Sequence, residues 1–125
     1  MEVTSRQVSG ITLIRIAGRI DHDHATALET ALAPFLEGPE ADGRRPLLLD
    51  MAEVGFLTSA GLRVLMIAAK ACKHQMRPMA IANLQPMIAE IVRISRFDLI
   101  IPVYPSTRAA LKAVSPEATG AGSGD

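Results

Sequence analysis

The residues best suited to chemistry in this sequence are two adjacent hydroxyl side chains, Thr58 and Ser59. A strand-like apolar segment precedes them and a helical pattern begins at Ser59, so the Ser59 hydroxyl is expected on an exposed turn beside free backbone N–H groups. A phosphoryl group there would bring about 1.5 to 2 negative charges to the positive end of the helix dipole, which tolerates them. Taken alone, Ser59 is interpreted more simply as the residue that caps the helix.

A second polar group, Asp21-His-Asp-His24, has side chains of the kind that bind metals. Residues two apart on a helix point in different directions, and no further His or Cys stands at ligand spacing, so we expect no metal site. Asp21 or Asp23 is expected to cap the helix that follows. Cys72 lies on an apolar helix face and is expected to be a buried structural thiol.

No other set of residues predicts catalysis. The glycine-rich sequences of phosphate-binding and dinucleotide-binding loops are missing, and no Ser, His and Asp stand in a recognisable catalytic context. We therefore expect a protein that is not an enzyme and needs no cofactor. An enzyme or nucleotide-binding domain is an alternative that rests only on the α/β pattern described below.

The composition indicates one globular domain. The 125 residues are 49% hydrophobic and 21% charged, which suffices for a core. Lys plus Arg and Asp plus Glu both number 13, so no net positive charge attracts nucleic acid. The sequence begins without the pattern of a signal peptide, and no apolar run approaches the roughly 18 residues of a membrane span. We expect a cytoplasmic protein without a nucleic-acid partner and without membrane insertion.

The segments that must position Ser59 alternate between strands and helices. Predicted strands cover about residues 3–8, 11–16, 46–50, 79–82 and 99–103. A turn is predicted at Ser9–Gly10. Predicted helices begin at Asp21, Ser59, Pro86 and Ser106. This alternation predicts an α/β fold, a mixed sheet of four to five strands with about four helices packed on it.

Periodicity also predicts which helix faces are buried. The apolar face of the first helix is Ala25, Leu28, Leu32 and Phe35, and Pro34 is expected to kink or shorten that helix. The apolar face of the second helix is Leu62, Leu65, Met66, Ala69 and Cys72. Its other face carries the basic residues Arg63, Lys70, Lys73 and His74, which could meet an acidic partner or simply be solvated. A loop holding Gly38, Pro39 and Gly43 joins the first helix to the strand at 46–50, and residues 115–125 are expected to form a disordered tail.

Residues 50–65 resemble the segment that is typical of STAS domains. That family has a strand ending in Asp, followed by Val-x-Phe-hydrophobic-Asp-Ser-Ser/Ala-Gly-Leu. The matching residues are Val54, Phe56, Leu57, Ser59, Ala60, Gly61 and Leu62. Gly18-Arg-Ile-Asp21 with His22 and Ala25 resembles the first family signature, and 97–111 resembles the last. The resemblance spans roughly residues 5–114 and is to the anti-sigma-factor antagonist type, so it implies a STAS domain over residues 1–114.

The resemblance also implies a function. It implies phosphorylation of Ser59, with Thr58 as a second candidate acceptor. It further implies a partner-binding face made of Asp21, His22, Thr58, Ser59, Ala60, Gly61, Leu62 and Arg63. Asp21 would orient Ser59 or contact the kinase, or only cap its own helix. The implied partners are an anti-sigma factor that is itself a serine kinase of the GHKL type and a PP2C-type phosphatase that reverses its action.

Two residues depart from the family pattern. Thr58 stands where family members commonly carry Asp, which removes a carboxylate next to the phosphorylation site and changes what a kinase would recognise. This departure keeps open an alternative, a STAS subunit of a lipid-transport ABC system or a signalling scaffold that is not phosphorylated. Arg96 replaces the glycine that usually ends the third helix in a left-handed conformation, and we expect that difference to be local.

Overall fold

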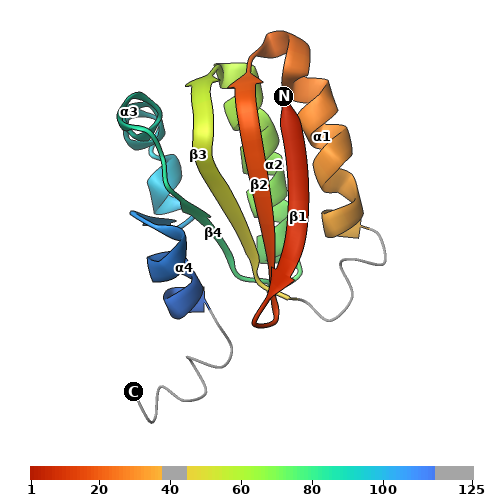
Figure 1. Ribbon diagram of the computed structural model, residues 1–125. Helices are drawn as coiled ribbons and strands as arrows, with labels where there is room; N and C mark the ends of the chain where they lie inside the picture. Colours follow the sequence, from red (N-terminus) through yellow and green to blue (C-terminus); the bar gives the residue numbers. More distant parts are fainter. Residues whose placement is uncertain (38–44, 115–125) are drawn as a thin grey trace.

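The computed structural model describes residues 1–37 and 45–114, which form one sheet with helices on both faces (Figure 1). The strands are β1 (Glu2–Val8), β2 (Ile11–Ile20), β3 (Leu47–Leu57), β4 (Met79–Ala82) and β5 (Val103–Tyr104). The helices are α1 (His22–Glu37), α2 (Ser59–His74), α3 (Pro86–Ile94), the short 3-10 helix η2 (Phe97–Leu99) and α4 (Thr107–Val114). The α/β fold with a mixed five-stranded sheet and four α-helices is confirmed.

The strands lie in the order in which they occur in the chain, β1-β2-β3-β4-β5. β1 and β2 are antiparallel, and they are joined at Ser9 and Gly10, which both have positive φ as a tight hairpin turn requires. β2, β3, β4 and β5 are parallel to one another, so the helices between them cross over the sheet. The carboxyl ends of β2 and β3 therefore meet at one edge of the sheet, where α1 and α2 begin (Figure 1).

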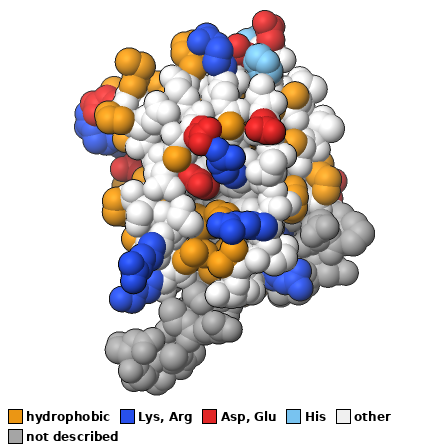
Figure 2. Space-filling view, viewed as in Figure 1, with side chains coloured by type: hydrophobic (Ala, Val, Ile, Leu, Met, Phe, Trp, Pro, Cys, Tyr) orange, Lys and Arg blue, Asp and Glu red, His pale blue; other side chains and the backbone are white. Residues whose placement is uncertain are grey.

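Two apolar layers hold the sheet and helices together. α1, α2 and α3 pack on one face of the sheet and bury apolar side chains there. Leu28, Leu65 and Ile88, one from each helix, are at most 1% exposed. α4 covers part of the other face, where Ala110 packs with the sheet residues Leu13 and Leu48. Acidic and basic side chains lie next to one another on the part of this face that faces the viewer in Figure 2. β3 has the middle position in the strand order, so the prediction of a central strand covered on both faces is confirmed.

Long-range pairing lengthens two strands beyond their predicted ends. β3 does not stop at Asp50 but continues to Leu57, and β2 runs past Gly18 to Ile20. The two extensions pair with each other through two irregularities of register, and Ile20 lies opposite Leu57. The polar sequence after Asp50 is strand because β2 supplies its hydrogen bonds, which local propensity does not reveal.

Three other predictions about the elements were wrong in part. Residues 99–102 are not strand, because Phe97–Leu99 forms a 3-10 turn that buries Phe97 and Ile101, and pairing begins only at Val103. Pro34 does not shorten α1, which continues past it to Glu37, and the kink that was the other expectation stays a prediction. The buried stripe of α1 is Leu28, Leu32 and Leu36, spaced four residues apart, while Phe35 is only partly buried.

The described residues include no helix that is long and apolar enough to cross a membrane. The predicted loop with Gly38, Pro39 and Gly43 and the predicted tail 115–125 lie outside the described residues.

Candidate functional site

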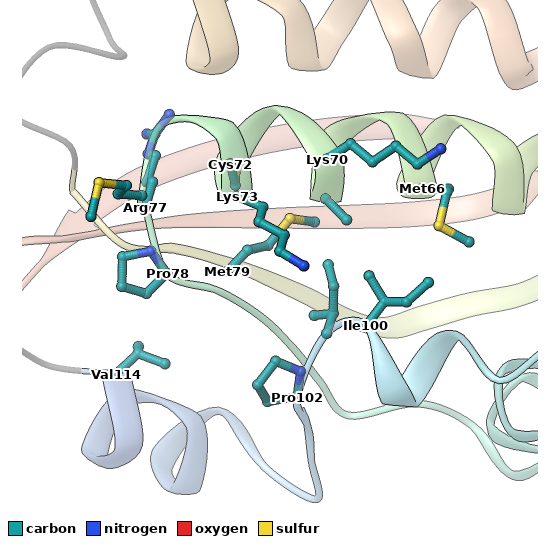
Figure 3. Close-up of a pocket in the computed structure, with 13 residues that line it drawn as sticks. Met66, Lys70, Cys72, Lys73, Arg77, Pro78, Met79, Ile100, Pro102 and Val114 are labelled. Carbon is teal, nitrogen blue, oxygen red and sulfur yellow. The ribbon is translucent and has the colours of Figure 1, made fainter.

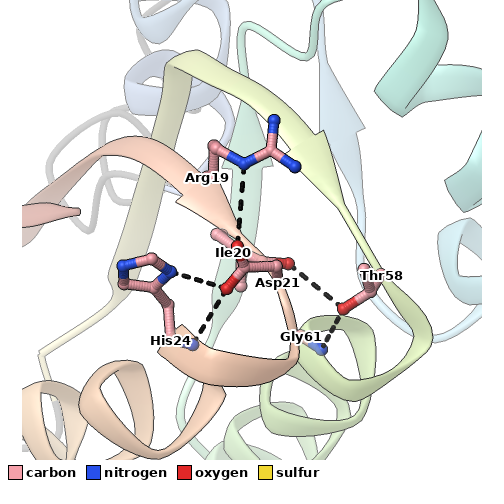
Figure 4. Close-up of polar contacts among 6 residues, drawn as sticks. All are labelled: Arg19, Ile20, Asp21, His24, Thr58 and Gly61. Carbon is pink, nitrogen blue, oxygen red and sulfur yellow. Dashed lines mark hydrogen bonds and ion pairs between the residues drawn. The ribbon is translucent and has the colours of Figure 1, made fainter.

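The turn after β2 and the turn after β3 lie side by side, and together they hold the hydroxyl residues and the acidic segment singled out in the sequence (Figure 4). The backbone N–H of Thr58 donates to the carbonyl oxygen of Ile20 at 3.0 Å. That hydrogen bond continues the parallel pairing one residue beyond Leu57. Asp21 and His22 therefore stand beside Thr58 and Ser59, as the family resemblance implied.

Thr58 caps α2. Its side-chain oxygen accepts a hydrogen bond from the Gly61 N–H at 3.4 Å, and its hydroxyl donates to the Ile20 carbonyl oxygen at 3.3 Å (Figure 4). Ser59 is the first residue inside the helix and is exposed. The prediction that Ser59 caps the helix was therefore wrong, because a cap is the extended residue before the first helical one, and Thr58 holds that position. The predicted exposure of Ser59 is confirmed.

Gly61 and Leu62 pack against the interior of the protein and hold the turn in place. Gly61 is buried, and a Cβ at this residue would lie only 2.8 Å from the Ile20 carbonyl oxygen and 2.9 Å from a methyl carbon of Leu57. Leu62 is partly buried against the main core. Of the residues implied for a partner-binding face, these two hold the turn in place, while His22, Ser59 and Arg63 are exposed and Asp21, Thr58 and Ala60 are partly exposed.

Asp21 caps α1 and contacts the side chains of His24 and Arg19. Its carboxylate accepts from the backbone N–H of His24 at 3.0 Å and lies 2.6 Å from Nδ1 of the same residue. Arg19 is 3.6 Å away on the other side (Figure 4). The hydrogen bond with the His24 ring is the main reason that the pKa of Asp21 is lowered from its usual value of 3.8. Among the described residues its hydrogen bonds go to His24, which favours the capping role over a role in orienting Ser59.

Arg19 also links this group to an exposed aromatic ring. Its guanidinium lies over the ring of Phe56, 3.9 Å from the centroid, in a cation–π contact. Phe56 is 36% exposed near the end of β3. Phe56 stands two residues before the cap of α2. With Arg19 from β2, it places an apolar ring and a positive charge at the end of the sheet from which α2 begins.

A hollow of about 290 Å³ lies between the first turns of α1 and α2. Three of the residues implied for partner binding line it, namely His22, Ala60 and Arg63. Glu29 on α1 and Ile67 on α2 continue the lining, and Ile67 is 42% exposed. The hollow is thus lined by charges of both signs, Glu29 and Arg63, and by an exposed apolar side chain, Ile67.

Sequence reasoning missed four residues of this face: Arg19, His24, Phe56 and Ile67. Phe56 had been treated only as a match to the family pattern. Ile67 had a signal in the sequence, because it is an apolar residue four positions after Arg63 and so lies on the helix face predicted to be polar. His24 lies one turn after Asp21, where a ring nitrogen reaches the capping carboxylate.

The remaining sequence candidates lie elsewhere. Within residues 1–37 and 45–114 no group of three or more His, Cys, Asp or Glu side chains could hold a metal. Cys72 is 1% exposed, and burial raises the pKa of its thiol, so it is the structural thiol that was predicted. Arg96 has a φ of 63°, so an arginine adopts the left-handed conformation that favours glycine, the residue that the family resemblance implied here.

Comparison with known proteins points to one family. The family described as STAS domain matches residues 2–110. A protein of Bordetella bronchiseptica named as an anti-sigma factor antagonist, BtrV, is 30% identical over 113 residues, which are 90% of this chain and 94% of that protein.

Solved structures show the same fold. A Thermotoga maritima protein described as an anti-sigma factor antagonist superposes with a TM-score of 0.81 at 14% identity, covering 90% of this chain and 93% of that chain. The anti-sigma factor antagonist SpoIIAA in its unphosphorylated form gives a TM-score of 0.71 at 13% identity, covering 90% and 96%. The phosphorylated form of the Bacillus protein SpoIIAA gives 0.67 at 11% identity, covering 90% and 99%.

Proposed function

Because this chain belongs to the STAS domain family, we propose that it acts as an anti-sigma factor antagonist whose affinity for its partner is set by phosphorylation of Ser59. The observation that carries this proposal is the exposed Ser59 hydroxyl at the start of α2, beside the turn at Asp21 and the hollow between α1 and α2. A kinase can reach that hydroxyl without opening the fold.

The surroundings of Ser59 favour a phosphate in the free protein. The positive end of the α2 dipole stabilises an anion, and Arg63 lies four residues further along the same helix face. By contrast, the Thr58 hydroxyl already donates to Ile20 and caps the helix, so it is the poorer acceptor of the two.

The same phosphate would oppose a partner that covers the turn. A docked protein would bury the dianion without enough compensating charge, which costs roughly 3 to 5 kcal/mol. That cost corresponds to about two to four orders of magnitude in affinity. Binding is thus switched with little change of shape, and the existence of SpoIIAA in phosphorylated and unphosphorylated forms of the same fold supports such a mechanism.

The proposed partners follow from the family. The unphosphorylated chain binds an anti-sigma factor that is a serine kinase of the GHKL type, and this binding frees a sigma factor. Phosphorylation by that kinase ends the interaction, and a PP2C-type phosphatase restores it. The chain itself is a binding protein in this cycle, and the kinase hydrolyses ATP.

The test is to incubate the chain with the GHKL-type kinase encoded nearest to it in the genome and ATP, and to locate the phosphoryl group by mass spectrometry. We expect it on Ser59 and none in Ser59→Ala. In a binding titration with the same kinase, Ser59→Ala should bind like the unphosphorylated chain and Ser59→Asp should bind at least about tenfold more weakly.

Ser9→Asp is the matched control, because it adds the same charge at an exposed turn at the opposite end of β2. It should bind like wild type. Phosphate on another residue, or equal binding by Ser59→Ala and Ser59→Asp, would contradict the switch. Thr58 in place of the usual Asp keeps open the alternative that the chain is a non-phosphorylated STAS subunit of a lipid-transport ABC system. Co-purification with an ATPase subunit of a lipid transporter, without any phosphorylation, would favour that alternative.

A further inference from the structure

An apolar groove lies beside the second half of α2, and Ser59 is not among its lining residues (Figure 3). Its volume is about 560 Å³, within the range of small-molecule sites. One wall is α2 with Met66 and Ala69, and the other is the segment Ile100–Pro102. Met79 on β4 forms part of its lining.

The mouth of the groove leaves large apolar side chains in contact with water. Met76 is 82% exposed and Ile100 is 48% exposed. A ligand that covers these side chains gains the free energy of removing their carbon surface from water. The groove therefore favours an occupant with a hydrocarbon part.

Among the described residues, every charged side chain that lines the groove is basic. Lys70 and Lys73 line it, and neither forms an ion pair with another described residue. Lys73 extends from α2 into the space towards the opposite wall, while Lys70 runs along the helix towards Met66 (Figure 3). Arg77 lines the groove too, but its guanidinium donates to the carbonyl oxygens of Phe35 and Arg45. No Asp or Glu of the described residues lines the groove.

From this combination we propose that the groove binds a free fatty acid. The alkyl chain lies against Met66, Met79 and Ile100, and the carboxylate meets the ammonium group of Lys73, while Lys70 adds positive charge on the same wall. An apolar cleft lined by positively charged side chains selects an anionic amphiphile over a neutral or cationic one.

This site is separate from the proposed phosphorylation switch. Ser59 begins α2, whereas the groove follows the same helix from Met66 to its end. A fatty acid in the groove leaves the turn at Ser59 uncovered, so the two proposals stand or fall independently. Ser59→Ala should bind fatty acid as wild type does.

The test is isothermal titration calorimetry of the whole unphosphorylated chain with sodium dodecanoate below its critical micelle concentration. We expect saturable binding with one site. Lys70→Glu/Lys73→Glu should bind dodecanoate at least about tenfold more weakly, since two attractive charges become repulsive. Dodecyltrimethylammonium, which has the same chain and the opposite charge, should bind at least about tenfold more weakly than dodecanoate.

Two variants guard against indirect effects. Arg108→Glu/Lys112→Glu makes the same charge change on exposed residues of α4 outside the groove and should bind like wild type. Ile100→Asp places a charge in the apolar wall at a half-exposed residue, so the fold survives while binding is lost.

Amide shifts in ¹H–¹⁵N spectra on adding dodecanoate should include Met79 and Ile101. Absence of saturable binding, equal binding of the cationic amphiphile, or full binding by the lysine double variant would overturn the proposal.

Discussion

Gly61 lies against Ile20 so closely that a Cβ on Gly61 would be 2.8 Å from the Ile20 carbonyl oxygen. The contact joins the first turn of α2 to the end of β2, and it sets how near the Ser59 turn lies to the Asp21 turn. A side chain at this residue must push the two apart.

Gly61→Ala should therefore destabilise the chain. Alanine favours helix over glycine, but the clash with backbone outweighs that gain, and we expect a net loss of about 1 to 3 kcal/mol in the free energy of unfolding. Urea unfolding measures it. Gly55→Ala is the control, because its Cβ would meet only the Gln85 side chain at 3.6 Å, an ordinary contact. Equal stability of Gly61→Ala and wild type would show that the close approach is not required.

Thr58 should be needed as a cap, not as a phosphorylation site. Thr58→Ala loses the hydrogen bonds to Gly61 and Ile20 and should lower the unfolding free energy by about 1 kcal/mol. Thr58→Asp, which restores the residue common in the family, should keep most of that stability, because Asp caps as well as Thr. Denaturant titrations compare the three proteins. A Thr58→Ala chain as stable as wild type would contradict the capping role.

A negative charge on Ser59 should leave the fold intact. Ser59→Asp places a carboxylate at the first helical residue, and we expect an unchanged or higher unfolding free energy, by about 0.3 to 1 kcal/mol at low salt. Added salt should reduce that gain. Circular dichroism during urea unfolding at two salt concentrations measures both effects. A large loss of stability would mean that weaker partner binding reflects unfolding and not a local charge.

The pair of Asp21 and His24 should make stability depend on pH in the acid range. The pKa of Asp21 is lower in the folded chain than its usual value of 3.8, so the unfolded chain binds the proton more tightly. The stabilisation is complete above that value and disappears as the pH falls through the lower folded-state pKa. Unfolding free energies measured from pH 2.5 to 7 should therefore fall less steeply below pH 4 in Asp21→Asn, which still caps α1.

His24→Ala provides the matching test of the cause. It removes the main hydrogen bond that lowers the pKa of Asp21 and keeps the backbone hydrogen bond and Arg19, so its acid profile should lie between those of wild type and Asp21→Asn. If His24→Ala keeps the wild-type profile while Asp21→Asn changes it, the backbone N–H of residue 24 and Arg19, not the His24 ring, lower the pKa of Asp21.

Arg96 is held in a conformation that suits glycine. A side chain at a left-handed residue costs about 1 to 2 kcal/mol, and replacing it with glycine removes this strain. Glycine also loses more backbone entropy on folding, which offsets part of the gain in stability. Arg96→Gly should raise the unfolding free energy by about 0.5 to 1 kcal/mol. Thermal and urea unfolding measure the change. Arg93→Gly, inside α3, is the control and should lower stability by about 1 kcal/mol.

Much of the fold follows from short patterns in the sequence. The apolar run at 47–49 indicated a strand covered on both faces because no polar residue interrupts it, and α2 was clear from the spacing of Leu65, Ala69 and Cys72. The same patterns failed where pairing with a distant segment decides the outcome. Residues 51–57 are strand only because β2 lies beside them, and 99–102 are not strand because Phe97 and Ile101 turn into the core.

The sequence by itself determined the order of the elements, the family, and Ser59 as the residue to examine, because periodicity and a contiguous motif act within a few residues. Only the tertiary structure decided that Thr58 is the cap, that Gly61 is buried beneath the turn, and that Lys73 reaches into an apolar groove. Each of these depends on contacts between residues far apart in the chain, such as Thr58 with Ile20, and no local pattern specifies where such residues meet.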